Sequence, residues 1–273
     1  MAGAGFAVYT MINLSIYIID VAVFIIGLII GSFLNSVIWR SSVNKSVAKG
    51  RSICPKCKHK LVTKDLVPLF SFLFLRAKCR YCKKPISWQY PLVELATGLV
   101  FVLILNFYFS NLILASFLII ISCFLIIIFV YDLKHYLILD QILWPAVALS
   151  AIFRVVEIAF INKNYFQFLD YTLAIAIGAG FFGILYLFSK GKWIGFGDIK
   201  LAILLGLILG WPNIIVGLFL SYLIGAIIGT SLIFLRKKKA KSEVPFAPFL
   251  ITGTFLALFL GQTIINWYLS LLE

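Results

Sequence analysis

The chain is poor in charged residues, and acidic residues are the scarcest of them. Its 273 residues include ten acidic and 24 basic side chains, and only 12% are charged, whereas 63% are hydrophobic. A soluble domain of this length would be far more polar. Several apolar runs reach the roughly 20 residues that a helix needs to cross a bilayer, and the alternating strands of a membrane barrel are absent. The sequence therefore predicts an all-α, polytopic membrane protein.

Several common catalytic and binding motifs are also missing. The chain has two isolated histidines, His59 and His135, which argues against a histidine-based metal site. It shows no recognisable Ser-His-Asp set, no phosphate loop with a Walker lysine and no glycine-rich Rossmann turn. The few acidic residues and the cysteines are therefore the candidate catalytic and metal-binding groups.

The positive charge is concentrated in one segment. Thirteen lysines and arginines but a single acid, Asp65, lie between Arg40 and Lys84. Nucleic acid could bind such a block, but the positive-inside rule explains it more simply as a cytoplasmic loop, so no nucleic-acid partner is expected. With about eight transmembrane helices, the basic residues at 134, 190–192 and 236–241 fall on the same side. Both termini then lie outside.

This topology divides the chain into four parts. Residues 1–15 are interpreted as an N-terminal extension that an expression vector could have contributed, because Met11 offers a second start. Residues 16–40 form the first transmembrane helix, 41–90 a small cytoplasmic cysteine domain, and 91–273 a seven-helix membrane core. The helices expected in that core cover 91–109, 112–131, 141–161, 169–188, 194–209, a run ending at 235, and 246–269.

Four cysteines of the cytoplasmic loop have metal-ligand spacing. They form two CxxC pairs separated by 21 residues: Cys54, Cys57, Cys79 and Cys82. This spacing is typical of a four-thiolate zinc site, which would hold together a segment that has little core of its own. Two disulfides are the alternative, but the reducing cytoplasm disfavours them. Cys123 lies in an apolar run and is interpreted as a small core residue.

An apolar stretch, Leu66–Leu75, separates the two cysteine pairs. It is too short to cross the membrane. It either packs on the cysteine domain or lies against the membrane face, and packing is the simpler interpretation.

Two aspartates mark the candidate active site. Asp198 follows Gly195 and Gly197 at the start of an apolar run, and the missing side chains would let a substrate backbone or a second helix approach closely. Asp132 ends the run 119–131. The topology places both acids at cytoplasmic helix ends, where they can meet. Intramembrane acids are costly and usually functional.

A simpler structural role remains open for Asp132 and for two other acids, Asp140 and Glu94. Asp132 could be a solvated helix end paired with Lys134 or Lys200, although an acid is unfavourable at a helix C-terminus. Asp140 fits an N-cap of the following helix. Glu94, one turn after Pro91, would favour the positive end of its helix dipole, with a functional role as the alternative.

Paired carboxylates tend to share one proton. The ionised member can take a proton from water while the protonated one polarises a carbonyl, which is aspartic-protease chemistry. Because such a pair titrates as a unit, neither residue is assigned as acid or base.

With these residues the chain resembles the bacterial type IV prepilin peptidase family from about Ile25 to its end. The first-helix motif, the cysteine loop with the segment after it, and the two aspartate motifs occur in the family's order: Gly31–Asn35 with Arg40; Arg51–Cys57 and Lys78–Cys82; Ile86-Ser87, Tyr90-Pro91 and Glu94; Asp132; Gly195-x-Gly197-Asp198-x-Lys200. One departure is Leu139-Asp140, where members often have proline before the acid or amide.

The resemblance implies an enzyme of the bacterial inner membrane. It would cleave the basic leader of prepilins or pseudopilins after a glycine at the cytoplasmic face, using Asp132 and Asp198. It would then methylate the new N-terminus with S-adenosylmethionine. The expected partners are the leader peptide, the substrate's N-terminal helix and the lipid bilayer. Arg40 and Glu94 are candidates for cofactor binding.

Two alternatives remain at this point. A secondary transporter could use the two aspartates as ion or proton sites, although no internal repeat is evident. Another GxGD intramembrane protease, of the signal-peptide-peptidase or presenilin kind, would share Tyr131-Asp132 and the glycine motif, but the cysteine loop favours the prepilin enzyme.

Overall fold

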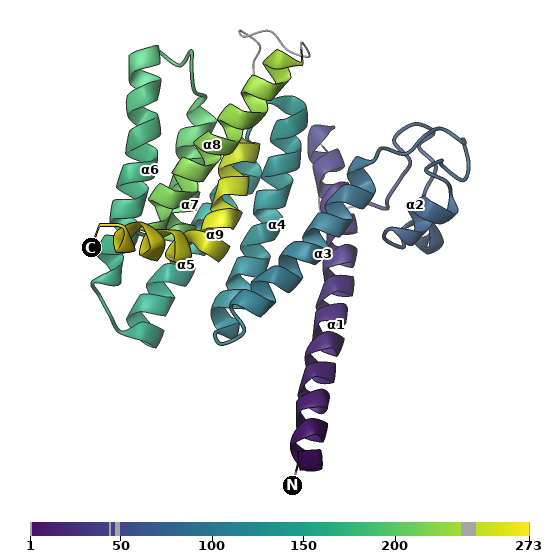
Figure 1. Cartoon of the computed structure of the whole chain (residues 1–273). Coiled ribbons are helices and arrows are strands. Elements are labelled where there is room, and N and C mark those ends of the chain that lie inside the picture. The colour runs from purple at the N-terminus through teal and green to yellow at the C-terminus, as the bar shows by residue number, and fades with distance from the viewer. Residues whose placement is uncertain (1, 44, 47–49, 236–243, 273) are drawn as a thin grey trace. The chain divides into compact units, whose positions relative to one another are not determined.

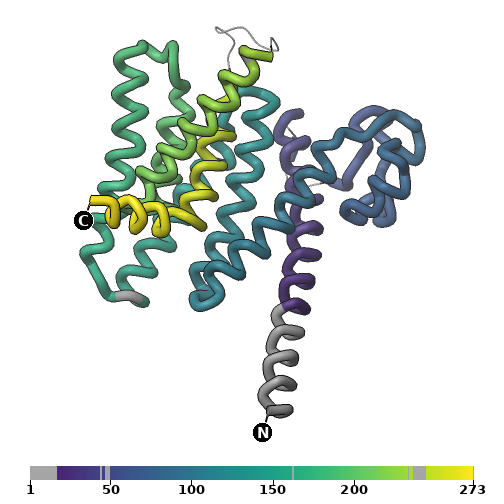
Figure 2. The backbone as a smooth tube through the Cα atoms, in the orientation of Figure 1, coloured from purple at the N-terminus to yellow at the C-terminus, as the bar shows by residue number. Residues whose placement is uncertain are grey.

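The structure is a computed structural model that describes residues 2–43, 45–46, 50–235 and 244–272. These residues form helices and two isolated β-bridges but no strand, which confirms the all-α prediction (Figure 1). The basic cluster expected at 236–241 lies outside them. Figure 2 shows the path of the chain.

The long helices follow the apolar runs of the sequence closely. Their bounds are α1 Ala2–Ser42, α3 Gln89–Phe107, α4 Leu112–His135, α5 Asp140–Val156, α6 Gln167–Ser189, α7 Phe196–Leu209, α8 Asn213–Phe234 and α9 Ala247–Ser270. A π-helical turn, Glu157–Asn162, extends α5, and the cysteine segment contains two short helices, η1 Thr63–Asp65 and α2 Phe70–Phe74.

Seven of the described helices are long and apolar enough to cross a membrane. Of the eight helices expected to cross the membrane, the remaining one is α7, which has only 14 residues. At 1.5 Å per residue it measures about 21 Å, which is less than the roughly 30 Å of a hydrocarbon core. Helix α1 begins at Ala2, and the part of it that could cross a membrane is Tyr17–Ser42, compared with the expected 16–40.

The chain divides into two compact units, residues 1–127 and 128–273, with the boundary inside α4. In the first unit, α1 packs against α3 through glycines. A Cβ atom on Gly27 would lie 2.6 Å from the Cα of Gly98, and one on Gly31 would lie 2.7 Å from the Cα of Glu94. The two backbones therefore touch directly, as small residues at helix interfaces allow.

In the second unit, α7 contacts α5, α6, α8 and α9. Its middle residues, among them Leu201, Ala202 and Leu204, are fully buried. A Cβ atom on Gly206 would lie 2.8 Å from the backbone nitrogen of Ile175 on α6, so these two helices are also in direct backbone contact. The short α7 is thus enclosed by longer helices, and its N-terminus is held in a fixed place.

Candidate active site and metal site

Asp132 lies in the last turn of α4, where its side chain is buried and only 5% of the residue is exposed. Its Oδ2 atom accepts a hydrogen bond from the backbone N–H of Ala247, at 3.2 Å. Ala247 is the first residue of α9, so Asp132 faces the positive end of that helix. The solvated ion pair with Lys134 or Lys200 is therefore not what the structure contains.

Asp198 occupies the first turn of α7, three residues after the N-cap Gly195. It is half-buried, and its carboxylate is close enough to Asp132 to interact electrostatically. The structure thus brings the two predicted aspartates together. The Asp132 carboxylate faces the N-terminus of α9, and Asp198 belongs to the first turn of α7. Both helix ends favour negative charge, which offsets the repulsion between two neighbouring carboxylates.

The start of α9 is a part of this site that sequence reasoning missed. Its contact with Asp132 joins residues 115 positions apart, a separation that no local pattern reveals. A weak signal was present, because Pro245 and Pro248 flank Phe246-Ala247 and prolines are frequent in the first helical turn.

The two glycines of the motif have different surroundings. A Cβ atom on Gly195 would lie 3.6 Å from Oδ2 of Asp198, so this glycine leaves space beside the carboxylate. A Cβ atom on Gly197 would lie 3.3 Å from the side chain of Ile138, so this glycine allows close packing. Substrate approach therefore stays a prediction for Gly195, while Gly197 has a packing role.

Asp140 corrects one expectation. It is the first residue of α5 and makes no side-chain cap; Leu139 occupies the N-cap position. Both carboxylate oxygens of Asp140 instead accept hydrogen bonds from Nζ of Lys200, each at 2.8 Å. The ammonium group also lies 5.1 Å from the centre of the Phe196 ring. An ion-pair partner on α7 outweighs the local cap, and it ties the motif helix to α5.

An aromatic cluster beside the aspartates also escaped the sequence analysis. The ring of Tyr222 on α8 lies 5.7 Å from Phe181, 6.3 Å from Phe182 and 5.1 Å from Phe246. Tyr222 interacts electrostatically with Asp198, and Phe246 directly precedes Ala247. The cluster therefore borders both carboxylates.

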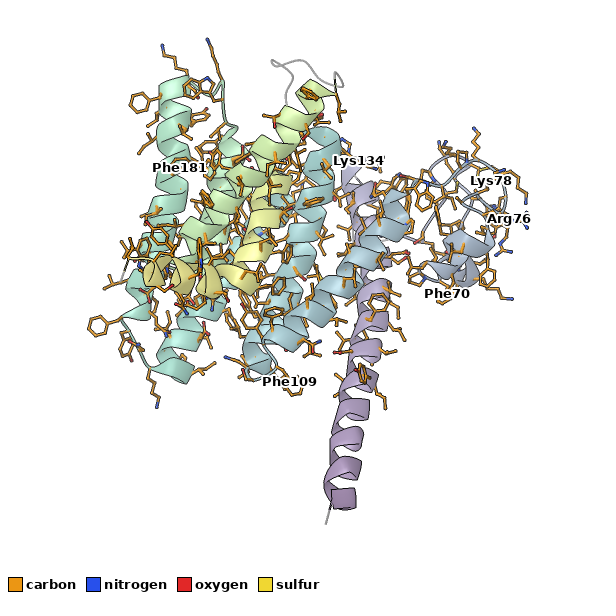
Figure 3. The ribbon with its side chains drawn as sticks, in the orientation of Figure 1. Phe70, Arg76, Lys78, Phe109, Lys134 and Phe181 are labelled. Atoms are coloured by element: carbon orange, nitrogen blue, oxygen red, sulfur yellow. The ribbon has the colours of Figure 1, made fainter. Side chains whose placement is uncertain are left out.

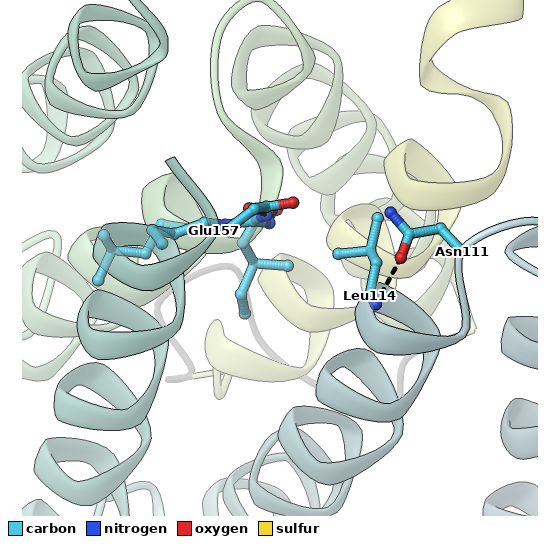
Figure 4. Close-up of polar contacts among 6 residues, drawn as sticks. Asn111, Leu114 and Glu157 are labelled. Atoms are coloured by element: carbon cyan, nitrogen blue, oxygen red, sulfur yellow. Dashed lines mark hydrogen bonds and ion pairs between the residues drawn. The ribbon is translucent and has the colours of Figure 1, made fainter. Parts of the chain in front are cut away.

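The opposite end of α7 is held by a buried charge. Arg154 on α5 donates hydrogen bonds to the carbonyl oxygens of Leu207 and Ile208, both at 2.9 Å, and to Oε2 of Glu157 at 2.6 Å. Figure 4 labels Glu157. These bonds satisfy carbonyls at the C-terminus of α7 that have no partner within the helix. Figure 4 also shows Asn111, whose Oδ1 accepts the N–H of Leu114 at 3.0 Å in the first turn of α4.

The four cysteines of the loop form one cluster. Their Sγ atoms all lie within 4.8 Å of one another, and sulfurs about 3.8 Å apart are what Zn–S bonds of about 2.3 Å give in a tetrahedron. All five cysteines of the chain are free thiols, so the disulfide alternative is not realised. The donor set therefore fits a metal ion.

Two matching turns build this cluster. The N–H of Cys54 bonds to the carbonyl of His59, and the N–H of Cys79 bonds to that of Lys84, both at 2.9 Å. Burial alone would raise the pKa of the Cys54 thiol, but the N–H groups of Cys57 and Lys56 bond to it and lower the pKa to about 7. The first turn thus favours the thiolate of Cys54. At Cys57 the N–H of His59 lowers the thiol pKa, but the neighbouring Cys54 and Cys82 side chains raise that pKa to about 11.

The two cofactor candidates have structural partners. Arg40 donates a hydrogen bond to the carbonyl of Gly50 at 2.6 Å. Glu94 is buried, and its Oε2 accepts the N–H of Leu69 at 2.8 Å, which joins α3 to the cysteine segment. Neither contact tests cofactor binding.

Comparisons with known proteins agree with these features. The profile described as bacterial peptidase A24 N-terminal domain matches residues 25–108, and that of the type IV leader peptidase family matches residues 119–230. The prepilin leader peptidase/N-methyltransferase of Aeromonas hydrophila is 32% identical over 91% of this chain and 93% of its own length.

The Bacillus subtilis protein of the same name is 33% identical over 91% of this chain and 97% of its own length. The Pseudomonas aeruginosa protein is 30% identical over 90% and 92%. No solved structure matches the chain significantly. The chain belongs to the type IV leader peptidase family.

Proposed function

We infer that this protein is a multi-pass inner-membrane enzyme that cleaves the leader peptide of prepilins and methylates the new N-terminus. Family membership and relatives named for both activities support this function. The observation that carries the peptidase assignment is the meeting of Asp132 and Asp198, which lie 66 positions apart in sequence, at the N-termini of α7 and α9.

The pair supports hydrolysis without a covalent intermediate. The ionised carboxylate takes a proton from water, whose oxygen attacks the scissile carbonyl carbon, while the protonated carboxyl donates to the carbonyl oxygen. When the tetrahedral species collapses, the C–N bond breaks and a proton passes from the pair to the leaving amine. The N–H of Ala247 holds Asp132 in place throughout, and the space beside Gly195 receives the peptide.

The substrate partners follow from this reaction and from the membrane setting. The enzyme takes the leader of a prepilin or pseudopilin together with the apolar helix that follows it. The density of basic residues in 40–84 supports a cytoplasmic location for the cysteine segment. The proposed topology has the acid pair on the same side and both termini outside.

The cysteine cluster holds one structural zinc ion through Cys54, Cys57, Cys79 and Cys82. Its four thiolates leave no open position for substrate, which is typical of structural zinc. The ion stabilises a segment whose described residues have few buried apolar side chains.

The methyltransferase step uses S-adenosylmethionine, which supplies a methyl group on a sulfonium cation. The amine released by cleavage must lose its proton and face that methyl group. A buried carboxylate suits a cationic donor, and Glu94 is one in the first unit. Glu94 and Arg40 are therefore retained as candidates for holding the cofactor.

The test of the peptidase is the purified protein with a prepilin leader peptide. Asp132→Asn and Asp198→Asn should each lower the cleavage rate about 10²- to 10⁴-fold, because each removes one of the two protonation roles. Asp170→Asn is the matched control, since Asp170 lies in the first turn of α6, away from the pair. Peptide cleavage is followed by mass spectrometry. Unchanged cleavage by either pair variant would remove that residue from the mechanism.

A further inference from the structure

The cysteine segment carries an apolar surface that the proposed chemistry does not use. It consists of Phe70, Leu73 and Phe74 on α2, here called the α2 face. These side chains are 58%, 67% and 83% exposed, respectively. Figure 3 shows Phe70 at the edge of this segment. Adjacent large apolar side chains with this exposure mark an interaction site.

Two contacts fix the depth of the α2 face relative to α3. Trp88 directly precedes α3, a helix long and apolar enough to span, and its ring lies 5.0 Å from the ring of Phe72 on α2. The N–H of Leu69, just before α2, bonds to Glu94 inside the second turn of α3 at 2.8 Å. The α2 face therefore lies level with the first turns of a membrane helix, where the headgroup region of the bilayer begins.

The chain around the α2 face is basic. Arg76 and Lys78 follow α2 within four residues and are exposed, and Figure 3 shows both at the surface of the segment. Lys83 and Lys84 are exposed as well. The single acid of the segment, Asp65, is engaged by Arg80, with Nε 2.7 Å from Oδ1. The surface therefore complements a negatively charged partner.

We propose that the α2 face inserts into the headgroup region of an anionic lipid leaflet. Aromatic and leucine side chains would occupy the boundary with the acyl chains, and Arg76 and Lys78 would reach lipid phosphates. Phenylalanine and leucine beside lysine and arginine are typical of interfacial segments, and Trp88, at the start of α3, is of the residue type enriched at this depth. Lipid contact fits the position of α2 beside the first turns of α3 better than a soluble partner does.

The cysteine cluster also fixes the position of the α2 segment. Cys54 and Cys57 precede α2, and Cys79 and Cys82 follow it. Closing the cluster holds both ends of the α2 segment, so the α2 face is presented as a rigid surface. A lipid-docked cysteine segment is in this way tied to the membrane at more points than the start of α3.

The experiment uses the full-length protein in nanodiscs and a matched pair of variants. Phe74→Trp places a reporter on the α2 face, and Val62→Trp places one at another exposed apolar position of the same segment, outside α2. Nanodiscs contain lipids brominated on the acyl chain, which quench tryptophan on contact, and hold either phosphatidylcholine alone or a mixture with phosphatidylglycerol. Emission of the wild type, with its six tryptophans, is subtracted.

We expect the tryptophan from Phe74→Trp to be quenched at least twofold more than that from Val62→Trp, and more strongly with phosphatidylglycerol. Adding Arg76→Gln and Lys78→Gln should abolish the increase that phosphatidylglycerol causes, while one metal ion per chain shows that the cysteine site is intact. Equal quenching of the two reporters contradicts the proposal. So does a reporter at position 74 that neither brominated lipid nor aqueous acrylamide quenches, because protein would then cover the face.

Discussion

At the residue scale, the site depends on how two acids are tolerated next to each other in an apolar protein. An isolated Asp132 at the C-terminus of α4 would face the negative end of that helix. The N–H of Ala247 reverses this disadvantage by offering a donor and the positive end of α9. The sequence predicted both acids because charges in apolar runs are rare, but it did not predict Ala247, whose contribution comes from its backbone.

Gly195 provides a residue-scale prediction. In Gly195→Ala the added methyl group should fit, because its nearest contact is Oδ2 of Asp198 at 3.6 Å and the backbone φ of −73° suits alanine. We expect a loss of stability of no more than about 1 kcal/mol, because alanine is a poorer N-cap residue than glycine. The cleavage rate should fall about tenfold or more, because the methyl group occupies the approach to the carboxylate.

The control for Gly195→Ala is Gly229→Ala. A Cβ atom there has nothing within 4 Å, and Gly229 lies in α8 beyond Tyr222. Cleavage and thermal unfolding are measured for both variants in the same detergent. A Gly195→Ala enzyme that cleaves at the wild-type rate would show that the peptide does not approach from this side.

At the element scale, α7 is held at both ends by charged side chains of α5. Lys200, in its second turn, pairs with Asp140, and Arg154 binds the carbonyls of Leu207 and Ile208. The apolar runs predicted the helix bounds to within a few residues in the membrane core, because turns and charges punctuate them. The charged ties of α7 were not predicted, since they link positions more than 50 residues apart.

The Arg154 tie can be tested by two substitutions. Arg154→Met should destabilise the protein by about 3–5 kcal/mol, because it leaves Glu157 as a buried, unpaired charge. Replacing both partners, Arg154→Met with Glu157→Leu, removes that charge as well. If Arg154 and Glu157 bonded only to each other, replacing both residues would cost little stability.

We expect the double variant to remain about 1–3 kcal/mol less stable than wild type, because the carbonyls of Leu207 and Ile208 lose their donors. Thermal unfolding in one detergent gives the comparison. A double variant as stable as wild type would mean that Arg154 does not hold the end of α7.

At the scale of the whole molecule, the chain separates its two kinds of site. The cysteine cluster lies in the unit 1–127 and the aspartate pair in the unit 128–273. The two family profiles fall on the same division, at residues 25–108 and 119–230. The CxxC spacing was enough to predict the first site, because each pair is local. The second depended on topology, which charge placement supplied.

Metal removal should therefore act on one unit first. Each chain should bind one zinc ion, measured by elemental analysis, and a strong chelator should remove it. We expect faster backbone hydrogen exchange in residues 50–88 after removal, because thiolate–metal bonds stabilise this segment, and little change in α7 and α9. Exchange that increases equally in both units, or protein isolated without metal from reducing buffer, would contradict a local structural zinc.

The same division predicts that the two reactions can be separated. Hydrolysis needs both aspartates, whereas methyl transfer needs only a neutral N-terminal amine positioned against the methyl donor. The Asp132→Asn protein should therefore still methylate a peptide that already has the mature N-terminus, at a rate within about threefold of wild type. Conversely, Cys54→Ser with Cys57→Ser should lower methylation at least as much as cleavage, because the cysteine segment is the largest described structure outside the spanning helices. Labelled S-adenosylmethionine and the pre-cleaved peptide measure transfer directly, and circular dichroism verifies the fold. If folded Asp132→Asn protein transfers no methyl group, the aspartate serves both reactions and the division is wrong.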